Sequence, residues 1–183
     1  MVNKIQKGGD NSPKQKINYS YFQNLVDSLK VIIFNENSLY KIAYNSKATL
    51  YGFITLAIYG LLSSISTLNP LLIIGNMATM LIAPFISFSI YNFIAKYIFG
   101  GEATGVQYFR SISNLFIIFW LSAIPKIGTF ILILGIIWLI AVNIFVLKKV
   151  HKLATWKAVI LGLLPLILIA IFFLGAGLIL LGA

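Results

Sequence analysis

The chain contains no cysteine, one histidine and only four acidic residues among its 183 positions. Without cysteine, disulfides, thiol catalysis, cysteine metal sites and palmitoyl anchors are excluded. The single histidine, His151, has lysines beside it and no acid near it in the sequence, so it does not suggest a zinc site. The four acids are far apart along the chain, which argues against a paired-carboxylate site. We therefore expect no cofactor and no bound metal.

Motifs of common catalytic sites are also missing from the sequence. There is no Gly-Lys-Ser/Thr loop to cradle phosphate and no Gly-x-Ser-x-Gly elbow to present a nucleophile. No ionisable residue falls deep within an apolar stretch, and such residues usually mark proton relays and ion paths in membranes. These absences argue against an enzyme and against an ion-coupled transporter, but they leave a passive pore open.

Charge is scarce along the chain: 10% of the residues are charged and 60% are hydrophobic, whereas soluble domains average about 25% charged residues. Apolar runs of about 20 residues are long enough to cross a bilayer as a helix. The chain has five such runs, and the third, Ser111 to Ile124, is short. It reaches spanning length only if Tyr108 and Phe109 are included and Arg110 extends toward the headgroups. The sequence predicts an all-α integral membrane protein with five transmembrane helices, over about 48–68, 71–95, 108–124, 127–147 and 158–181.

Positive charges fall almost entirely on one side of this five-span arrangement. Lys126 is the only Lys or Arg in the loops of the other side. Positively charged residues in short loops stay in the cytoplasm, so the charged side and the N-terminus are expected there. A four-span arrangement would move four lysines of residues 148–157 outside, against this rule. The residues on the expected cytoplasmic side are Lys4, Lys7, Lys14, Lys16, Lys30, Lys41, Lys47, Lys96, Arg110, Lys148, Lys149, Lys152 and Lys157.

Three regions follow from the polarity pattern: a disordered cytoplasmic tail over 1–19, an amphipathic juxtamembrane segment over 20–47 and the membrane domain over 48–183. Ser20 can cap a helix, with Gln23 as its capping-box partner. Such a helix beside a membrane usually lies in the interface plane, where it packs on the cytoplasmic ends of the spans or docks a partner. Its expected apolar face is Phe22, Leu25, Val26, Leu29, Ile32 and Ile33, and its polar positions, away from that face, are Gln23, Asn24, Asp27 and Lys30.

Two amides lie near the inner ends of expected spans. Asn92 belongs to the second span and Asn143 to the fourth, at similar depth. A hydrogen bond between them would join the two helices with about 0.6–2 kcal/mol. The alternative interpretation is that they line the path of a small neutral or anionic solute. The interhelical contact is the simpler of the two.

The segment Ala123-Ile-Pro-Lys-Ile-Gly128, followed by an apolar span and then Val150-His-Lys-Leu-Ala-Thr-Trp-Lys-Ala158, resembles the Yip domain family, named for Ypt/Rab-interacting proteins. Members typically have a Pro-x-Ile-Gly turn, a span, and a Val-His-x-Leu-Ser/Thr-x-x-Lys-Ala segment that enters the last helix. The matching positions are Pro125, Gly128, Val150, His151, Leu153, Lys157 and Ala158.

The resemblance implies five spans and a cytoplasmic N-terminus, and the charge pattern predicts the same topology independently. Eukaryotic members act in vesicle traffic at the Golgi and endoplasmic reticulum and bind prenylated Rab GTPases. This chain lacks their Asp-Leu-Tyr-Gly-Pro segment and is more similar to the short prokaryotic members. The resemblance therefore implies a role in membrane organisation or traffic, in the plasma membrane of a prokaryote or in the Golgi and endoplasmic reticulum of a eukaryote.

The net charge of +10 would suggest nucleic acid for a soluble protein, but anionic lipid headgroups are the better partner for a membrane protein. The first hypothesis is a non-enzymatic multi-pass protein whose cytoplasmic face binds lipid or a protein partner, with self-association left open. The second is a passive channel or carrier for a small solute, and a membrane enzyme is third. The residues expected to contact lipid or a partner are Lys148, Lys149, Lys152 and Lys157.

Overall fold

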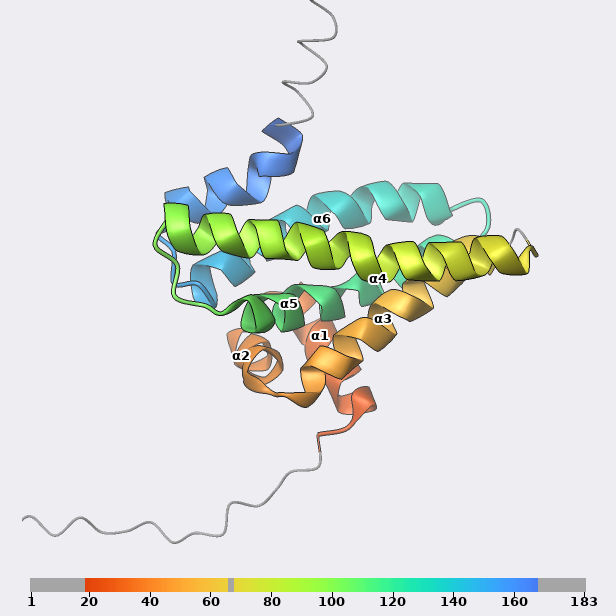
Figure 1. Cartoon of the computed structure of the whole chain (residues 1–183), viewed down its shortest axis with the longest axis horizontal. Helices are drawn as coiled ribbons and strands as arrows, with labels where there is room; N and C mark the ends of the chain where they lie inside the picture. The colour runs from red at the N-terminus through yellow and green to blue at the C-terminus, as the bar shows by residue number, and fades with distance from the viewer. Residues whose placement is uncertain (1–18, 66–67, 168–183) are drawn as a thin grey trace, which may run out of the picture.

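A computed structural model describes residues 19–65 and 68–167, and within these residues the chain is helical with no strand (Figure 1). The apolar runs within the described residues are helical. A helix satisfies the hydrogen bonds of its own backbone, which an apolar environment requires. The elements are α1 (Tyr21–Ile32), α2 (Glu36–Tyr44), α3 (Lys47–Ser64), α4 (Pro70–Phe93), the π-helical η2 (Ile94–Ile98), α5 (Gly105–Ser113), the 3₁₀-helical η3 (Asn114–Ala123), α6 (Gly128–Lys149) and a last helix over Thr155–Ile167.

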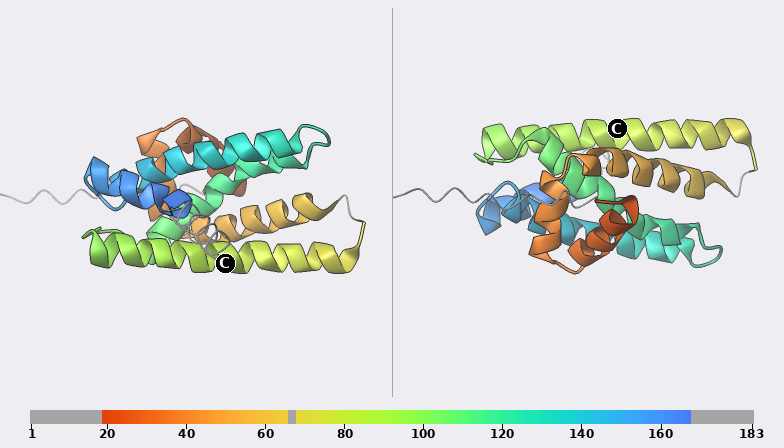
Figure 2. Two further views of the ribbon diagram at one scale, coloured as in Figure 1. Left: turned by 90° about the horizontal axis from the view of Figure 1, so that it is seen from above. Right: turned by 90° about the horizontal axis from the view of Figure 1, so that it is seen from below.

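Helices α3 and α4 form an antiparallel hairpin along one side of the molecule (Figure 2). The expected break at Asn69-Pro70 starts α4: the Asn69 side chain accepts a hydrogen bond from the backbone nitrogen of Leu71 at 3.0 Å, and proline occupies the first turn, where its missing N–H costs nothing. The hairpin closes tightly at Gly60, because a Cβ there would lie 2.7 Å from Cα of Met77.

The expected third span is a composite of α5 and η3. Thr104 and Gln107 form a capping box that starts α5, and the chain changes from α-helix to 3₁₀-helix after Ser113. Because a 3₁₀-helix rises about 2.0 Å per residue and an α-helix about 1.5 Å, the 19 residues of 105–123 extend for roughly 33 Å. The run that looks short in the sequence therefore has the length of a bilayer core.

The side chain of Arg110 does not extend out of this segment toward the headgroups. Its Nε donates to Oγ1 of Thr49 at 2.6 Å and a terminal nitrogen donates to the carbonyl of Ala43 at 3.4 Å, so the side chain ties α5 to the junction between α2 and α3. The expected extension toward the headgroups is replaced by contacts within the protein.

The turn between η3 and α6 is very short, as the sequence predicts. Lys126 adopts a left-handed φ of 70°, and the backbone nitrogen of Ile127 donates to the carbonyl of Pro125 at 2.9 Å, which makes a γ-turn. A Cβ at Gly128 would collide with the carbonyl of Ser122, so only glycine allows α6 to start this close to the end of η3.

Among the described residues, two helices are long and apolar enough to cross a membrane, namely Pro70–Ile98 and Gly128–Lys149. Their most apolar stretches are only 6% and 22% buried, respectively. The second span thus continues beyond the expected end at residue 95. Helix Thr155–Ile167 is shorter, and much of the expected fifth span lies outside the described residues, as do residues 1–18 of the tail expected over 1–19. Crossings at all five positions remain a prediction.

Helix α1 begins where the sequence predicts, since the Ser20 hydroxyl accepts from the backbone nitrogen of Gln23 at 3.2 Å. Its orientation, however, is the reverse of the expected one. Asn24 and Asp27 are buried, whereas Phe22, Leu29 and Ile33 are 75%, 52% and 72% exposed. The helix packs on α2 and η3 with the side that carries Asn24 and Asp27, so the expected orientation was wrong for these two residues, whereas Gln23 and Lys30 are exposed as expected.

Candidate functional site

The loops 99–104 and 150–154 lie at the same end of the bundle, beyond the C-terminal ends of η2 and α6 (Figure 2). Two contacts join these loops, and a third joins the first loop to the last helix. The backbone nitrogen of Glu102 donates to the carbonyl of His151 at 3.1 Å, the side chains of Lys152 and Glu102 form an ion pair, and Nζ of Lys157 donates to the carbonyl of Phe99 at 2.9 Å. We call this paired set of loops the clasp. It fixes the ends of α4 and α6 relative to each other.

His151 occupies the centre of the clasp and is fully buried. Its ring lies 5.3 Å from that of Tyr108, and its Nδ1 would be 2.7 Å from a Cβ at Gly101. Neither ring nitrogen has a hydrogen-bond partner among the described residues. Burial, with a smaller contribution from the charge of Lys96, lowers the pKa of His151 to about 4. The imidazole is therefore neutral at physiological pH and packs as a ring.

No metal can be assigned to this histidine from its surroundings. Within the residues that the structure describes, no three His, Cys, Asp or Glu side chains gather as a metal site would require.

The positions that carry the resemblance to the Yip domain family act as packing residues in this structure. Val150, Leu153 and Ala158 are buried around His151, and Lys157 bonds to the Phe99 carbonyl. Gly128 permits the tight start of α6, and Pro125 is exposed in the turn before it. Residues 150–154 of this segment thus belong to the clasp.

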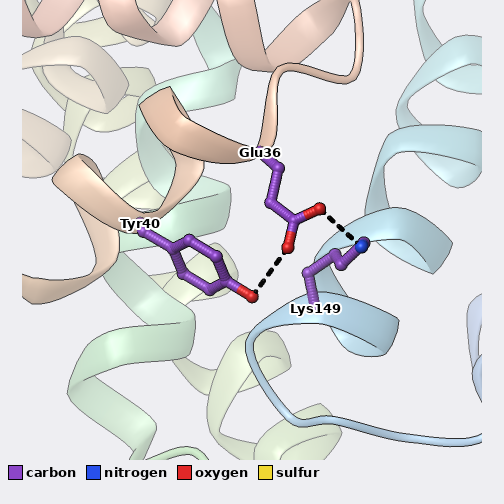
Figure 3. Close-up of polar contacts among 3 residues, drawn as sticks. All are labelled: Glu36, Tyr40 and Lys149. Carbon is purple, nitrogen blue, oxygen red and sulfur yellow. Dashed lines mark hydrogen bonds and ion pairs between the residues drawn. The ribbon is translucent and has the colours of Figure 1, made fainter.

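Three of the four lysines that the sequence marks as a contact surface are engaged by the protein itself. Lys149 pairs with Glu36, whose carboxylate also accepts from the Tyr40 hydroxyl at 3.0 Å (Figure 3). These two hydrogen bonds, from Lys149 first and Tyr40 second, hold the pKa of Glu36 below its usual value. Lys152 and Lys157 belong to the clasp. The contact surface predicted from 148–157 is consequently narrower than expected.

Free cations remain at the same end of the molecule. Lys148 and Lys41 are exposed and form no ion pair or hydrogen bond with a described residue. Lys96 is also exposed, and its ammonium lies 5.7 Å from the ring of Tyr97, on the π-helical end of the second span. These three side chains are available to a negatively charged partner.

Asn92 and Asn143 do not bond to each other in the described structure. The Asn143 side-chain oxygen accepts from the Tyr108 hydroxyl at 2.8 Å, so it does join two helices. The side-chain oxygen of Asn92 is buried and has no partner. The residues also line separate cavities. Asn92 lies beside one of about 300 Å³ between α3, α4 and α5, and Asn143 beside one of about 240 Å³ next to α6.

The most extensive buried polar cluster was missed in the sequence. Asn24 donates to the side-chain oxygen of Asn114 at 2.7 Å, and Asn114 in turn donates to the carbonyls of Ala48 and Arg110 at 3.0 and 2.8 Å. One signal was present, because Asn114 interrupts an otherwise apolar run. Its partner on α1 is 90 residues away and could not be read from periodicity.

No family model, curated protein or solved structure matches this chain.

Proposed function

We propose that this chain is a multi-pass membrane protein of the Yip domain type, with its lysine-rich end in the cytoplasm and with no enzymatic activity, which binds anionic lipid headgroups through that end. In this proposal the chain crosses five times, at the positions that the sequence predicts. A protein partner in membrane organisation or traffic would use the same surface.

The observation that carries the proposal is the exposure of the two long apolar helices. A core helix of a water-soluble protein is mostly buried, whereas only 6% and 22% of the apolar stretches of Pro70–Ile98 and Gly128–Lys149 are buried. Apolar surface of this extent is stable in contact with lipid chains and strongly unfavourable in water.

The distribution of charge supports the orientation. The free cations Lys41, Lys96 and Lys148 belong to the end of the bundle that carries the clasp, and Lys126 lies in the turn at the other end of α6. Positive residues in short loops favour the cytoplasm. Near an anionic leaflet each lysine contributes about 1 kcal/mol of attraction.

Topology can be tested with single cysteines because the chain has none of its own. Lys126→Cys should react with a membrane-impermeant maleimide on intact cells, and Lys148→Cys only after the membrane is opened. Labelling of both positions from the same side would contradict the proposed orientation.

Lipid binding can be tested by native mass spectrometry of the purified protein with phosphatidylglycerol. The triple variant Lys41→Gln, Lys96→Gln, Lys148→Gln should hold this lipid roughly a hundredfold less tightly, because three attractions of about 1 kcal/mol are lost. The same three positions changed to Arg keep the charge and should keep the lipid, and Lys126→Gln should have no effect. Equal retention by all variants would exclude this surface as the lipid site.

A passive carrier is the second candidate, and the observation that favours it is the unpartnered oxygen of Asn92 beside a cavity. A solute with a hydrogen-bond donor would satisfy that oxygen. Flux of such a solute into proteoliposomes should disappear with Asn92→Leu. Absence of flux across a broad panel of small neutral and anionic solutes would remove this candidate.

A further inference from the structure

Helix α1 has the opposite orientation to that of an amphipathic helix in water, because an apolar face is exposed and polar residues are buried. The side chains of Asp27 and Asn24 point into the protein and are satisfied there: Asp27 accepts from the Tyr19 hydroxyl at 3.1 Å and from the Ser38 hydroxyl at 2.9 Å, and Asn24 bonds to Asn114. Gln23 and Lys30 lie on the exposed side of the helix. The side chains of Phe22, Leu29 and Ile33 form the outer face and are mostly exposed. In water this orientation would be the less stable one, since polar groups gain little from burial and apolar groups lose much from exposure.

The depth of α1 follows from its contacts along α6. Glu36 pairs with Lys149 at the end of α6, the ring of Phe34 lies 5.5 Å from that of Phe145, and the carbonyl of Ile32 accepts from the Trp138 indole at 2.9 Å. Trp138 precedes Lys149 by 11 residues, which is about 16 Å along a helix. The chain from 32 to 36 therefore climbs beside α6 from its middle to its lysine-rich end.

Other contacts of α1 give a similar depth. Asn24 meets Asn114, which follows the first residue of α5 by nine positions, or about 13 Å of helix. The hydroxyl of Tyr21 lies 3.3 Å from Oγ1 of Thr55, about two turns into α3. Helix α1 thus lies against the sides of the crossing helices and not on their ends, where an interfacial helix was expected.

The C-terminal end of α1 satisfies its backbone without water. Phe34 adopts a left-handed φ of 63°, so that the backbone nitrogen of Asn35 donates to the carbonyl of Lys30 and that of Phe34 to the carbonyl of Val31. The carbonyl of Ile32, which a helix end leaves open, takes the Trp138 indole. Donors from within the protein thus reach the carbonyls of Lys30, Val31 and Ile32, and such internal pairing is what a hydrocarbon environment favours.

The space beside this helix end is apolar. A groove of about 530 Å³ runs between α1, η3 and α6, and its wall includes Ile33, Leu121 and Leu134. It is continuous with the exposed side of α6, where Ile133, Leu134 and Ile137 are 54%, 50% and 61% exposed. The outer face of α1 and the membrane-facing side of α6 therefore form one apolar surface.

We propose that α1 and the ascending segment to Glu36 form a re-entrant element embedded in the cytoplasmic half of the bilayer, and that lipid acyl chains cover the face of Phe22, Leu29 and Ile33. This inference rests on the proposed membrane location and orientation. Lys30 is the one charged residue on the exposed part of α1, and its long side chain extends toward the headgroups.

The test uses nitroxide labels on single cysteines in the full chain, reconstituted in lipid nanodiscs. Leu29→Cys and Ile33→Cys are the test positions, and both are exposed, so the label does not disturb packing. Ile82→Cys, in the middle of α4 and 60% exposed, is the lipid reference, and Lys148→Cys is the aqueous reference. Collision rates with oxygen, which concentrates in lipid, and with a water-soluble nickel chelate are measured for each label.

The expected result is that labels at 29 and 33 match the label at 82, with at least severalfold more collisions with oxygen than with nickel. Collisions that match those at 148 would show a water-facing helix and overturn the inference, while the label at 82 still supports the membrane location. Low collision with both reagents would show that a second copy, or another part of the chain, covers the face, and would also overturn it. A water-accessible label at 82 would overturn the proposed function itself.

Discussion

The indole nitrogen of Trp138 donates a hydrogen bond of 2.9 Å to the carbonyl oxygen of Ile32, which is 106 residues earlier in the chain. This bond joins the middle of an apolar helix to the end of a helix that has a polar inner side. The bond supplies the indole N–H with an acceptor and the end-of-helix carbonyl with a donor. Both groups need such a partner where water is absent.

Replacement of Trp138 by Phe should therefore destabilise the protein by about 1–3 kcal/mol, since the Ile32 carbonyl would lose its donor. The change is measured as a lower midpoint of thermal unfolding in detergent. Trp156→Phe is the matched control, because Trp156 is 60% exposed and its nitrogen has no partner among the described residues. Equal shifts for both variants would mean that the bond contributes nothing specific.

The pair Asn24 and Asn114 is suited to a double-mutant cycle. Asn24→Leu or Asn114→Leu alone leaves a buried amide without its partner and should cost about 1–3 kcal/mol. The double variant should cost measurably less than the sum of the two single changes. Strict additivity in the unfolding free energies would show that the 2.7 Å contact does not couple the two helices.

Two glycines offer a matched comparison of packing. Gly101→Ala would place a Cβ 2.7 Å from Nδ1 of His151 and 2.9 Å from the carbonyl of Ala95, so it should destabilise the clasp by about 1–3 kcal/mol. Gly75→Ala meets no atom within 4 Å in the middle of a helix and should leave stability equal or raise it by up to about 1 kcal/mol. The free energies of chemical unfolding of both variants check the prediction. An unchanged unfolding free energy for Gly101→Ala would contradict the close packing of Gly101 against His151 and Ala95.

The single histidine predicts how stability changes with pH. Its pKa is about 4 in the folded protein and near 6.5 when exposed, so between these values the unfolded chain binds a proton that the folded chain does not. The free energy of unfolding should therefore fall as the pH decreases from 7 to 5. His151→Gln should unfold at nearly the same midpoint at both pH values, and a wild-type decrease that persists in this variant would assign the effect elsewhere.

Local signals in the sequence predicted local structure well. The Ser20 cap, the Asn69-Pro70 break and the short turn at Pro125 are all present, because each depends on residues within one turn of chain. The helical spacing of apolar residues also predicted α1 correctly as a helix. Its rotation could not be predicted, because periodicity gives the position of the two faces but not the solvent outside them.

Long-range partners account for the other differences. Lys149, Lys152 and Lys157 look alike in the sequence, and only the folded chain brings Glu36, Glu102 and the Phe99 carbonyl to them. The same applies to Asn143, which pairs with Tyr108 and not with the expected Asn92. Each of these contacts joins residues at least 35 positions apart, and no pattern within a single helix encodes them.

The 3₁₀-helix η3 sets the length over which residues 105–123 extend. Rewound as an α-helix, its ten residues would shorten by about 5 Å, nearly one helical turn. Arg110 is held in place by its hydrogen bond to Thr49, so the shortening would move the turn at Pro125 and Lys126. The charge of Lys126 would then be drawn toward the hydrocarbon core. If residues 105–123 cross the bilayer as proposed, the bilayer thickness that this chain tolerates depends on how these ten residues are wound.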